Sequence, residues 1–454
     1  HLSLRRQRQM CIRDSINLSK YILVFLMLLY TYLCFRINTI STYKKNKGHV
    51  IAQKVFIMLI FAVCYALILY HDFSLITFLC LALELIYLIF FPVLFKVIYP
   101  ESSDVITNNM TFMLALGFVM IERLAPHNAI KQFGIVMAGS VLFFFIPVFF
   151  RKKEAVIKAK YVYAIVGIIL LAITLVLGRT SFGANLSFTI AGLTFQPSEF
   201  VKILFVLFVA SMLSKSSGFK EILISAIFAF AHVIILVLST DLGAALIFFI
   251  VYLIMIYIAS GKVVYLLTGF AAGAGASVVA YHLFAHIRVR VSVWLNPWAD
   301  IDGKGYQITQ SLFAIGTGGW FGMGLYGGLP TSIPVVSKDF VFSAIAEEFG
   351  LVFAICVALV CVSIFLEIMK NATLCKDMFN KLLAAGIGVL YIFQCFLTIG
   401  GVTKFIPSTG VTLPFVSYGG SSILSSLIMF AIVQTVCMKV REDINEKEIR
   451  KSKE

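Results

Sequence analysis

Apolar runs long enough to cross a lipid bilayer recur along the chain from Tyr21 to Val440. A spanning helix needs about 20 mostly apolar residues, and only helices or closed barrels satisfy their backbone groups in lipid. Because these runs are continuous rather than alternating, they predict helices and an all-α polytopic membrane protein. Thirteen spanning segments are predicted, at residues 20–38, 51–70, 74–99, 109–125, 132–150, 161–177, 199–214, 221–239, 242–260, 263–285, 340–369, 382–400 and 419–440.

Charge is sparse and unevenly placed. Only 13% of the residues are charged, against about 25% in soluble domains. The net charge of +15 comes from Lys and Arg in short loops between apolar runs, which is the positive-inside pattern, so no nucleic-acid partner is expected. The basic regions are 36–54, 151–160, 215–220, 370–381 and the tail from 441. They fall on one side of the predicted topology, which should be cytoplasmic.

The chain divides lengthwise into four parts. Residues 1–15 lack the apolar stretch of a signal peptide and are expected to be a cloning scar or an assembly artefact. Residues 16–102 form an extension with three predicted helices, and 103–440 hold ten helices and the polar motifs, including a long outward loop at 286–338. Residues 441–454 are a basic tail. None of the nine cysteines forms a CxxC pair, which argues against a zinc site or a disulfide framework.

The outward loop is the part richest in aromatic and glycine residues. It contains all three tryptophans of the chain, Trp294, Trp298 and Trp320, and Trp favours the membrane–water interface. One interpretation is an interfacial re-entrant segment with glycine turns. The other is a wall for an amphiphilic substrate, part sugar and part lipid. The residues alone leave both interpretations open.

Three carboxylates follow that loop. Asp339 stands where the loop meets the membrane, so it is either a helix N-cap, worth about 1 kcal/mol, or a general base. Lys338 beside it would lower its pKa or bind an anionic group. Glu347 and Glu348 lie about two turns further in. Carboxylates within a membrane are costly and point to function, but these two are equally explained as buried partners of helix-end donors.

Two further segments carry polar residues at helix starts. Gln196, Pro197, Ser198 and Glu199 open one predicted helix, with Lys202 three residues after Glu199, and Asp241 opens another. Capping is the simplest role for both. Residues 407–422 place two prolines and three glycines among hydroxyl side chains. Irregular backbone at membrane depth is tolerated where it lines a cavity, so this segment is expected to line one.

Taken together, the motifs resemble the SEDS family, which includes FtsW, RodA and SpoVE. The resemblance covers about residues 105–440 and rests on QPSE-x-x-K (196–202), DLG (241–243), NPWAD-x-x-GKGYQ-x-x-QSL-x-AIG-x-GG-x-x-G-x-G (296–324), DFVFSAIAEEFG (339–350) and P-x-TG-x-TLPFVSYGGSS (407–422). It implies a ten-helix SEDS-like core, here preceded by about three extra N-terminal transmembrane helices. Departures from the family pattern are Ser337-Lys338 before the aspartate, Thr398 and Thr409.

The resemblance also implies an activity. It is that of a peptidoglycan glycosyltransferase, which polymerises lipid II at the outer face of the bacterial cytoplasmic membrane, in division or shape maintenance. The implied partners are a class B penicillin-binding protein, which supplies the transpeptidase, and other divisome or elongasome membrane proteins. Asp339 would remove the proton of the acceptor 4-hydroxyl, and a lipid pyrophosphate would leave. The charge of the leaving pyrophosphate needs cations, which are either Arg288, Arg290, Lys338 or Lys404 or a divalent metal, Mg²⁺ or Mn²⁺, with unknown ligands.

The motifs and the resemblance give three groups of candidate residues. The catalytic candidate is Asp339. The substrate-binding candidates are Arg288, Arg290, Asn296, Pro297, Trp298, Tyr306, Gln307, Gln310, Lys338, Lys404, Ser417, Tyr418, Ser421 and Ser422. The supporting candidates are Gln196, Pro197, Ser198, Glu199, Lys202, Asp241, Glu347 and Glu348. Two rival functions use the same residues: a transporter that flips lipid II, and a scaffold that recruits a class B penicillin-binding protein.

Overall fold

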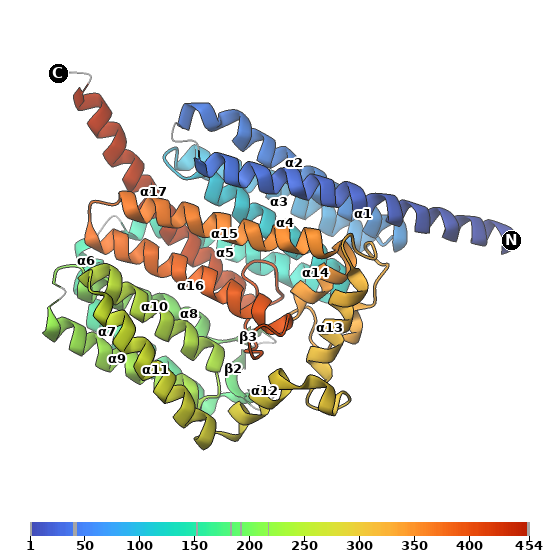
Figure 1. Ribbon diagram of the computed structural model, residues 1–454. Coiled ribbons are helices and arrows are strands. Elements are labelled where there is room, and N and C mark those ends of the chain that lie inside the picture. Colours follow the sequence, from blue (N-terminus) through green and yellow to red (C-terminus); the bar gives the residue numbers. More distant parts are fainter. Residues whose placement is uncertain are drawn as a thin grey trace.

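The computed structural model is a bundle of long helices (Figure 1). It describes residues 2–39, 43–150, 153–181, 184–190, 193–216 and 218–451. Within these residues twelve helices are long and apolar enough to cross a membrane. The predicted segment 199–214 is not among these twelve; it corresponds to α8 (Pro197–Leu213), a buried helix of 17 residues. The all-α membrane architecture expected from the apolar runs is therefore confirmed.

Three helices form the N-terminal extension, namely α1 (Leu2–Thr39), α2 (Tyr43–His71) and α3 (Leu75–Ile98). The turn between α2 and α3 is fixed by Ser74, whose hydroxyl accepts hydrogen bonds from the amides of Ile76 and Thr77. Helix α1 packs on α2 and α15, whereas α2 and α3 both pack on α4. Figure 1 shows the extension along one side of the bundle.

The core begins with α4 (Asp104–Leu124), and every residue of this helix from Asp104 to Glu122 is buried. Its two asparagines have partners on the extension. Asn109 Oδ1 accepts a hydrogen bond from the Tyr30 hydroxyl at 2.8 Å, and the Asn108 amide donates to Gln53 Oε1 at 3.2 Å. Buried polar groups need such partners, because an unpaired one costs about 1–3 kcal/mol. The extension and the core are thus joined by polar as well as apolar contacts.

Besides α4 and α8, the described core contains eight further long helices. They are α5 (Ala129–Phe150), α7 (Lys160–Leu177), α9 (Phe219–Leu238), α10 (Leu242–Ser260), α11 (Val263–Leu283), α15 (Leu351–Leu374), α16 (Met378–Val402) and α17 (Gly420–Lys451), with a short α6 (Lys153–Lys158). Helix α5 packs on α17, and α16 packs on α8, α10 and α15. Together with α4 and α8 they form the ten-helix core that the resemblance implies.

The structure corrects one predicted segment. Residues 340–369 do not form one helix but two, α14 (Val341–Phe349) and α15, which meet at Gly350. Gly350 has a φ of +90°, and a Cβ on it would lie 2.3 Å from the backbone nitrogen of Gly322. The helix therefore breaks because another segment of backbone passes too close for a side chain.

The outward segments contain secondary structure that the apolar pattern does not predict. The loop 286–338 includes α12 (Ala285–Leu295), α13 (Tyr306–Gly318) and two short 3₁₀ turns at Pro297–Asp300 and Pro330–Ser332. The segment before α8 folds into a small antiparallel sheet of β1 (Arg179–Ser181), β2 (Ala184–Ile190) and β3 (Leu193–Phe195). The loop 286–338 is thus mostly helical.

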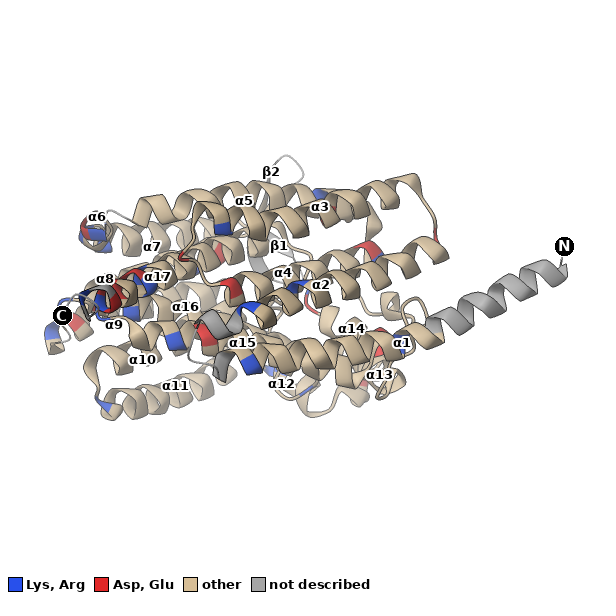
Figure 2. Ribbon diagram, turned by 90° about the horizontal axis from the view of Figure 1, so that it is seen from above, with Lys and Arg blue, Asp and Glu red and all other residues tan. Residues whose placement is uncertain are grey.

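The two ends of the bundle differ in charge. Figure 2 shows basic residues around α6 and the C-terminal part of α17, at the end opposite α13 and α14. These residues belong to the basic regions expected on the cytoplasmic side. That assignment of sides stays a prediction, since it rests on the positive-inside pattern.

Candidate functional site

A cavity of about 360 Å³ opens at the end of the bundle that carries α12 and α13. This volume lies in the usual range for ligand pockets, about 300–1,000 Å³. Its walls come from α12, α13, residues 335–339, residues 401–412 and the segments that begin α8 and α10. Two carboxylates, Asp241 and Asp339, share the cavity with four basic residues, Arg290, Lys304, Lys338 and Lys404.

Asp339 lies in the cavity wall just before α14. It is not the cap of this helix, because the N-cap residue is Phe340 and no side chain caps it. The backbone that leads to Asp339 is fixed from behind: the Tyr418 amide donates to the Ser337 carbonyl at 2.7 Å, and the Ser417 hydroxyl donates to the Lys338 carbonyl at 2.5 Å. The backbone next to Asp339 is therefore held in place, and the carboxylate of Asp339 is not used as a helix cap.

The electrostatic surroundings of Asp339 act in two directions. Burial raises the pKa of Asp339 above the usual range of a carboxyl group, whereas its own backbone N–H and the charges of Lys338 and Arg290 lower it. The effect of burial is the larger one, so the pKa of Asp339 is raised. A base with a raised pKa binds a proton more strongly, and general bases work best when their pKa lies near the operating pH.

Two side chains of the cavity, Arg290 and Trp294, are oriented by backbone carbonyls of the 401–412 segment. Arg290 donates from Nη1 to the Ser408 carbonyl at 2.9 Å, and Trp294 donates from Nε1 to the Lys404 carbonyl at 3.2 Å. Both donors lie on α12. These two bonds join α12 to the opposite wall, so the cationic side chains face one space.

Backbone strain gathers around the same cavity. Five non-glycine residues of the described chain have positive φ, and three of them, Thr240, Val335 and Lys404, line the cavity. Two of these are β-branched, for which positive φ is a genuine outlier. Strained conformations of this kind cost about 1–3 kcal/mol each and cluster at functional sites. The cavity is thus a place where geometry is maintained at the expense of stability.

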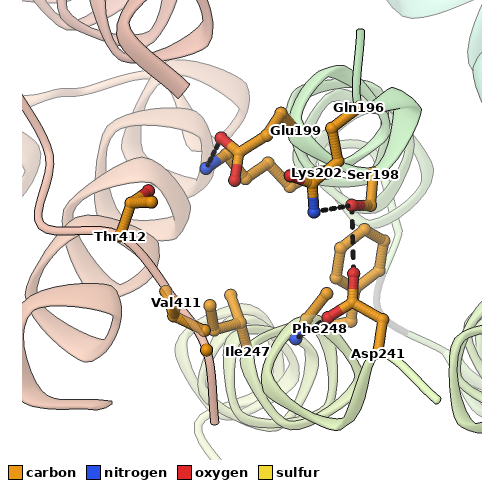
Figure 3. Close-up of a pocket in the computed structure, with 11 residues that line it drawn as sticks. Gln196, Ser198, Glu199, Lys202, Asp241, Ile247, Phe248, Val411 and Thr412 are labelled. Carbon is orange, nitrogen blue, oxygen red and sulfur yellow. Dashed lines mark hydrogen bonds and ion pairs between the residues drawn. The ribbon is translucent and has the colours of Figure 1, made fainter. Parts of the chain in front are cut away.

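A smaller polar pocket of about 30 Å³ adjoins the cavity and shares Gln196, Asp241, Gly410 and Thr412 with it. Figure 3 shows the carboxylate of Asp241 facing Ser198, whose hydroxyl donates to Oδ2 at 3.1 Å. Asp241 also caps α10 by accepting from the Ala244 amide. The capping role expected for Asp241 is therefore present, and the residue faces the pocket as well. Capping by a side chain at the start of α8, also expected, is absent, because its N-cap is Gln196 and no side chain caps it.

Glu199 and Lys202 form the expected pair on α8, at 2.6 Å (Figure 3). Lys202 Nζ also donates to Gln394 Oε1 at 2.8 Å, and the Ser425 hydroxyl donates to Glu199 Oε2 at 2.8 Å. Helices α8, α16 and α17 thus meet in one buried polar network. Gln394 and Ser425 are outside the sequence motifs, so no local pattern predicts them.

Several candidate residues support the cavity without lining it. The Ser421 hydroxyl accepts from the Gln196 amide at 3.0 Å, and Ser422 is hydrogen-bonded to Thr412 at 2.7 Å. With Ser417 and Tyr418, these residues brace the wall from the side of α17. Their position agrees with the expectation that residues 407–422 border a cavity.

Other substrate-binding candidates lie away from the cavity. Arg288 is exposed and donates to the His282 carbonyl at 2.6 Å, and Trp298 is 46% exposed and packs on Phe313. The cavity walls also omit Asn296, Pro297, Tyr306 and Gln310. Of the substrate-binding set, the cavity is lined by Arg290, Gln307, Lys338 and Lys404.

The two glutamates of α14 contact the protein itself. Glu347 Oε1 accepts from the Leu329 amide at 2.9 Å. Glu348, whose side chain is fully buried, pairs with Arg123 at 2.8 Å and accepts from the Tyr326 amide at 3.1 Å. These contacts match the interpretation of both residues as buried partners.

Some cavity residues have no place among the candidates. They include Lys304, Trp294, Thr240 and Ser408. Lys304 lies within the 296–324 motif and Trp294 two residues before it, so their charge and ring were the available signals. Ser408 belongs to the segment 407–422 that was expected to line a cavity, whereas nothing in the sequence marks Thr240.

A family model described as a cell cycle protein, FtsW/RodA/SpoVE, matches residues 105–442. The peptidoglycan glycosyltransferase RodA of Mycobacterium tuberculosis (strain ATCC 25618 / H37Rv) is 33% identical over 383 residues, covering 78% of this chain and 81% of the relative. The enzyme of the same name from Mycobacterium leprae is 32% identical over 374 residues, covering 77% and 80%.

Solved structures show the same relationship. One chain, from a study of how a peptidoglycan synthase complex coordinates polymerization and crosslinking, is 26% identical with a TM-score of 0.66, covering 75% of this chain and 98% of that one. The rod shape determining protein RodA of Thermus thermophilus is 25% identical with a TM-score of 0.56, covering 74% and 96%.

Proposed function

Because the chain belongs to the FtsW/RodA/SpoVE family and is a peptidoglycan glycosyltransferase, we propose that it polymerises lipid II with Asp339 as the general base. One observation carries this proposal: Asp339 shares a cavity with four basic side chains at the end of the bundle opposite the basic loops. A carboxylate can accept a proton, and cations can stabilise the negative charge of a departing pyrophosphate. The cavity therefore combines the two groups that an inverting sugar transfer needs.

In the proposed reaction Asp339 removes the proton of the acceptor 4-hydroxyl while the oxygen attacks the anomeric carbon of the lipid-linked donor. The bond from that carbon to the pyrophosphate oxygen breaks, and both electrons leave with the lipid pyrophosphate. General-base catalysis typically contributes about 10²–10⁴-fold. Positioning of the two sugars by the cavity walls supplies further acceleration.

The basic residues have a defined task in this proposal. Negative charge grows on the leaving pyrophosphate, and preorganised cations stabilise charge that develops in a transition state. Arg290 is held by the Ser408 carbonyl and faces the same cavity as Asp339. Its guanidinium suits bidentate binding of phosphate oxygens. Lys304, Lys338 and Lys404 add charge around the same space.

The expected divalent cation does not fit a site made of protein ligands alone. Among the residues that the structure describes, no three His, Cys, Asp or Glu side chains gather closely enough to hold a metal. Mg²⁺ is commonly bound by one or two carboxylates together with substrate phosphates. The proposal of Mg²⁺ or Mn²⁺ therefore depends on the pyrophosphate, and comparing polymerisation in EDTA with polymerisation in added Mg²⁺ tests it.

We also propose a crosslinking partner, a class B penicillin-binding protein in the same membrane. The support is the fold shared with a chain from a peptidoglycan synthase complex that coordinates polymerization and crosslinking. Copurification of the full chain with candidate transpeptidases tests this part.

The polymerase proposal has a direct test. The purified chain and its partner are mixed with labelled lipid II and no other polymerase, and glycan chains are separated by gel electrophoresis. Glycan chains are expected. Transport of labelled lipid II across vesicles without chain formation would instead support a flippase, and recruitment of the partner without either activity would support a scaffold.

A pH profile tests the electrostatics of Asp339. The base must be ionised, so the rate should fall as the pH drops through its raised pKa. Lys338→Met removes a positive charge that lowers the pKa of Asp339, so the pKa should rise further and the acid limb of kcat/KM should move to higher pH. Lys262→Met, an exposed residue between α10 and α11, is the control. An unchanged acid limb in Lys338→Met would contradict the assignment of Asp339 as the base.

A further inference from the structure

We propose that the N-terminal extension acts as a clamp that positions Asp339, through a segment that we call the outer turn, residues 319–326. Lys20, Tyr21 and His71 are the positioning residues of this clamp. The inference rests on the proposed function, since it takes Asp339 as the base. It assigns a role to two helices of the extension, α1 and α2, which precede the residues matched by the family model, beginning at 105.

The extension contacts the outer turn at three points. Lys20 Nζ donates to the Gly322 carbonyl at 3.3 Å, and the ring of Tyr21 lies 5.4 Å from that of Phe321. At the end of α2, the imidazole of His71 stacks on the ring of Tyr326, with centroids 4.0 Å apart and planes inclined by 15°. Figures 1 and 2 both show α1 passing beside α14. Two separate helices of the extension thus contact the same turn.

The core contacts the outer turn at Tyr326, the residue on which His71 stacks. The guanidinium of Arg123 lies 4.3 Å from the centre of the Tyr326 ring, and the Tyr326 amide donates to Glu348 Oε1 at 3.1 Å. Tyr326 has a φ of +68°. A bulky residue adopts this conformation only where its surroundings enforce it. Arg123, Glu348 and His71 together hold Tyr326 in a conformation that the free chain disfavours.

The outer turn is bonded to the end of α14. The amides of Met323 and Gly324 donate to the carbonyls of Glu347 and Glu348, both at 2.9 Å, and the Leu351 amide donates to the Gly319 carbonyl at 2.9 Å. The contact is close, since a Cβ on Gly322 would lie 2.3 Å from the Glu348 carbonyl oxygen. A movement of the outer turn would therefore move the C-terminal end of α14.

Helix α14 connects the outer turn to Asp339 in the cavity wall. It is a single helix of nine residues, and Asp339 stands two residues before its first residue, Val341. Because a short helix moves as a unit, its two ends shift together. The other support of this segment, from Ser417 and Tyr418, acts on residues 337 and 338. Two sets of contacts therefore set the position of Asp339. One is made by Ser417 and Tyr418, in the loop before α17, and the other by the clamp acting through α14.

The test removes the His71 stack and then restores it. His71→Ala should lower kcat about threefold to tenfold with KM for lipid II nearly unchanged, because a small misplacement of the base slows the chemical step. His71→Phe keeps a flat ring against Tyr326 and should recover most of kcat. Tyr70→Ala alters the neighbouring side chain, which is 45% exposed, and should leave kcat unchanged. All variants are made in the full chain with its partner.

Hydrogen exchange supplies a readout that does not depend on activity. The amides of Met323 and Gly324 should exchange faster in His71→Ala than in the wild type, also in an Asp339→Asn background. If exchange and kcat in His71→Ala equal those of the wild type, or if His71→Phe fails to recover kcat, the clamp is refuted. If Asp339→Asn polymerises normally, the proposed function fails instead, and the exchange data still decide whether the extension orders the outer turn.

Discussion

Asp339→Asn should reduce glycan polymerisation by about 10²–10⁴-fold while leaving the protein folded. Asparagine keeps the size of the side chain but cannot accept the proton of the acceptor hydroxyl. Since Asp339 does not cap α14, the change removes no hydrogen bond from the helix. The measurement is the rate of glycan-chain formation from labelled lipid II by the purified variant with its partner.

The matched control is Asp302→Asn, in the same outward segment. Asp302 is exposed and lies outside the cavity walls, so this variant should polymerise at the normal rate. Thermal unfolding of both variants in detergent should resemble that of the wild type. Normal polymerisation by Asp339→Asn would show that the base is another residue.

Arg123→Met is expected to have the largest effect on stability, a loss of about 3–5 kcal/mol in the free energy of unfolding. The Glu348 side chain is fully buried and that of Arg123 only 12% exposed, so removing the guanidinium leaves a buried carboxylate without its counter-charge. The contact of Arg123 with the Tyr326 ring is lost as well. Unfolding by SDS titration in micelles measures the difference.

A second substitution separates the charge effect from lost packing. In the double variant Arg123→Met with Glu348→Gln, the neutral amide still accepts from the Tyr326 amide and no charge is left unpaired. The double variant should therefore be more stable than Arg123→Met alone. If it is equally unstable, lost packing outweighs the unpaired charge and the buried ion pair matters less than its geometry suggests.

The long helices follow from the sequence because continuous apolar runs have few other solutions in lipid. The break at Gly350 does not, since apolar residues stand on both sides of it and its cause is the backbone of Gly322, 28 residues earlier. The pairing of Arg123 with Glu348 joins residues 225 positions apart. Local periodicity contains no information about contacts of this kind.

The chemistry of the site could be predicted from the sequence, but only some of the residues that line the cavity could be. Asp339, Arg290, Lys338 and Lys404 stand out as charges in outward segments, and all four line the cavity. Arg288 had the same appearance in a segment expected to be a loop. In the structure it lies on α12, two positions from Arg290, and residues two apart on a helix do not face the same side. Knowing that the segment is helical would have separated the two arginines.

The complete burial of α4 has a consequence for how the chain enters the membrane. This helix is the least hydrophobic of the twelve candidate spans, and it carries Asn108, Asn109 and Glu122 where it touches only protein. Polar residues make a helix partition poorly into lipid when it emerges alone. Three strongly apolar helices leave the ribosome before it, and two of them hold partners for its asparagines. The order of synthesis thus supplies α4 with a protein surface to insert against, so the extension would assist biogenesis as well as the folded enzyme.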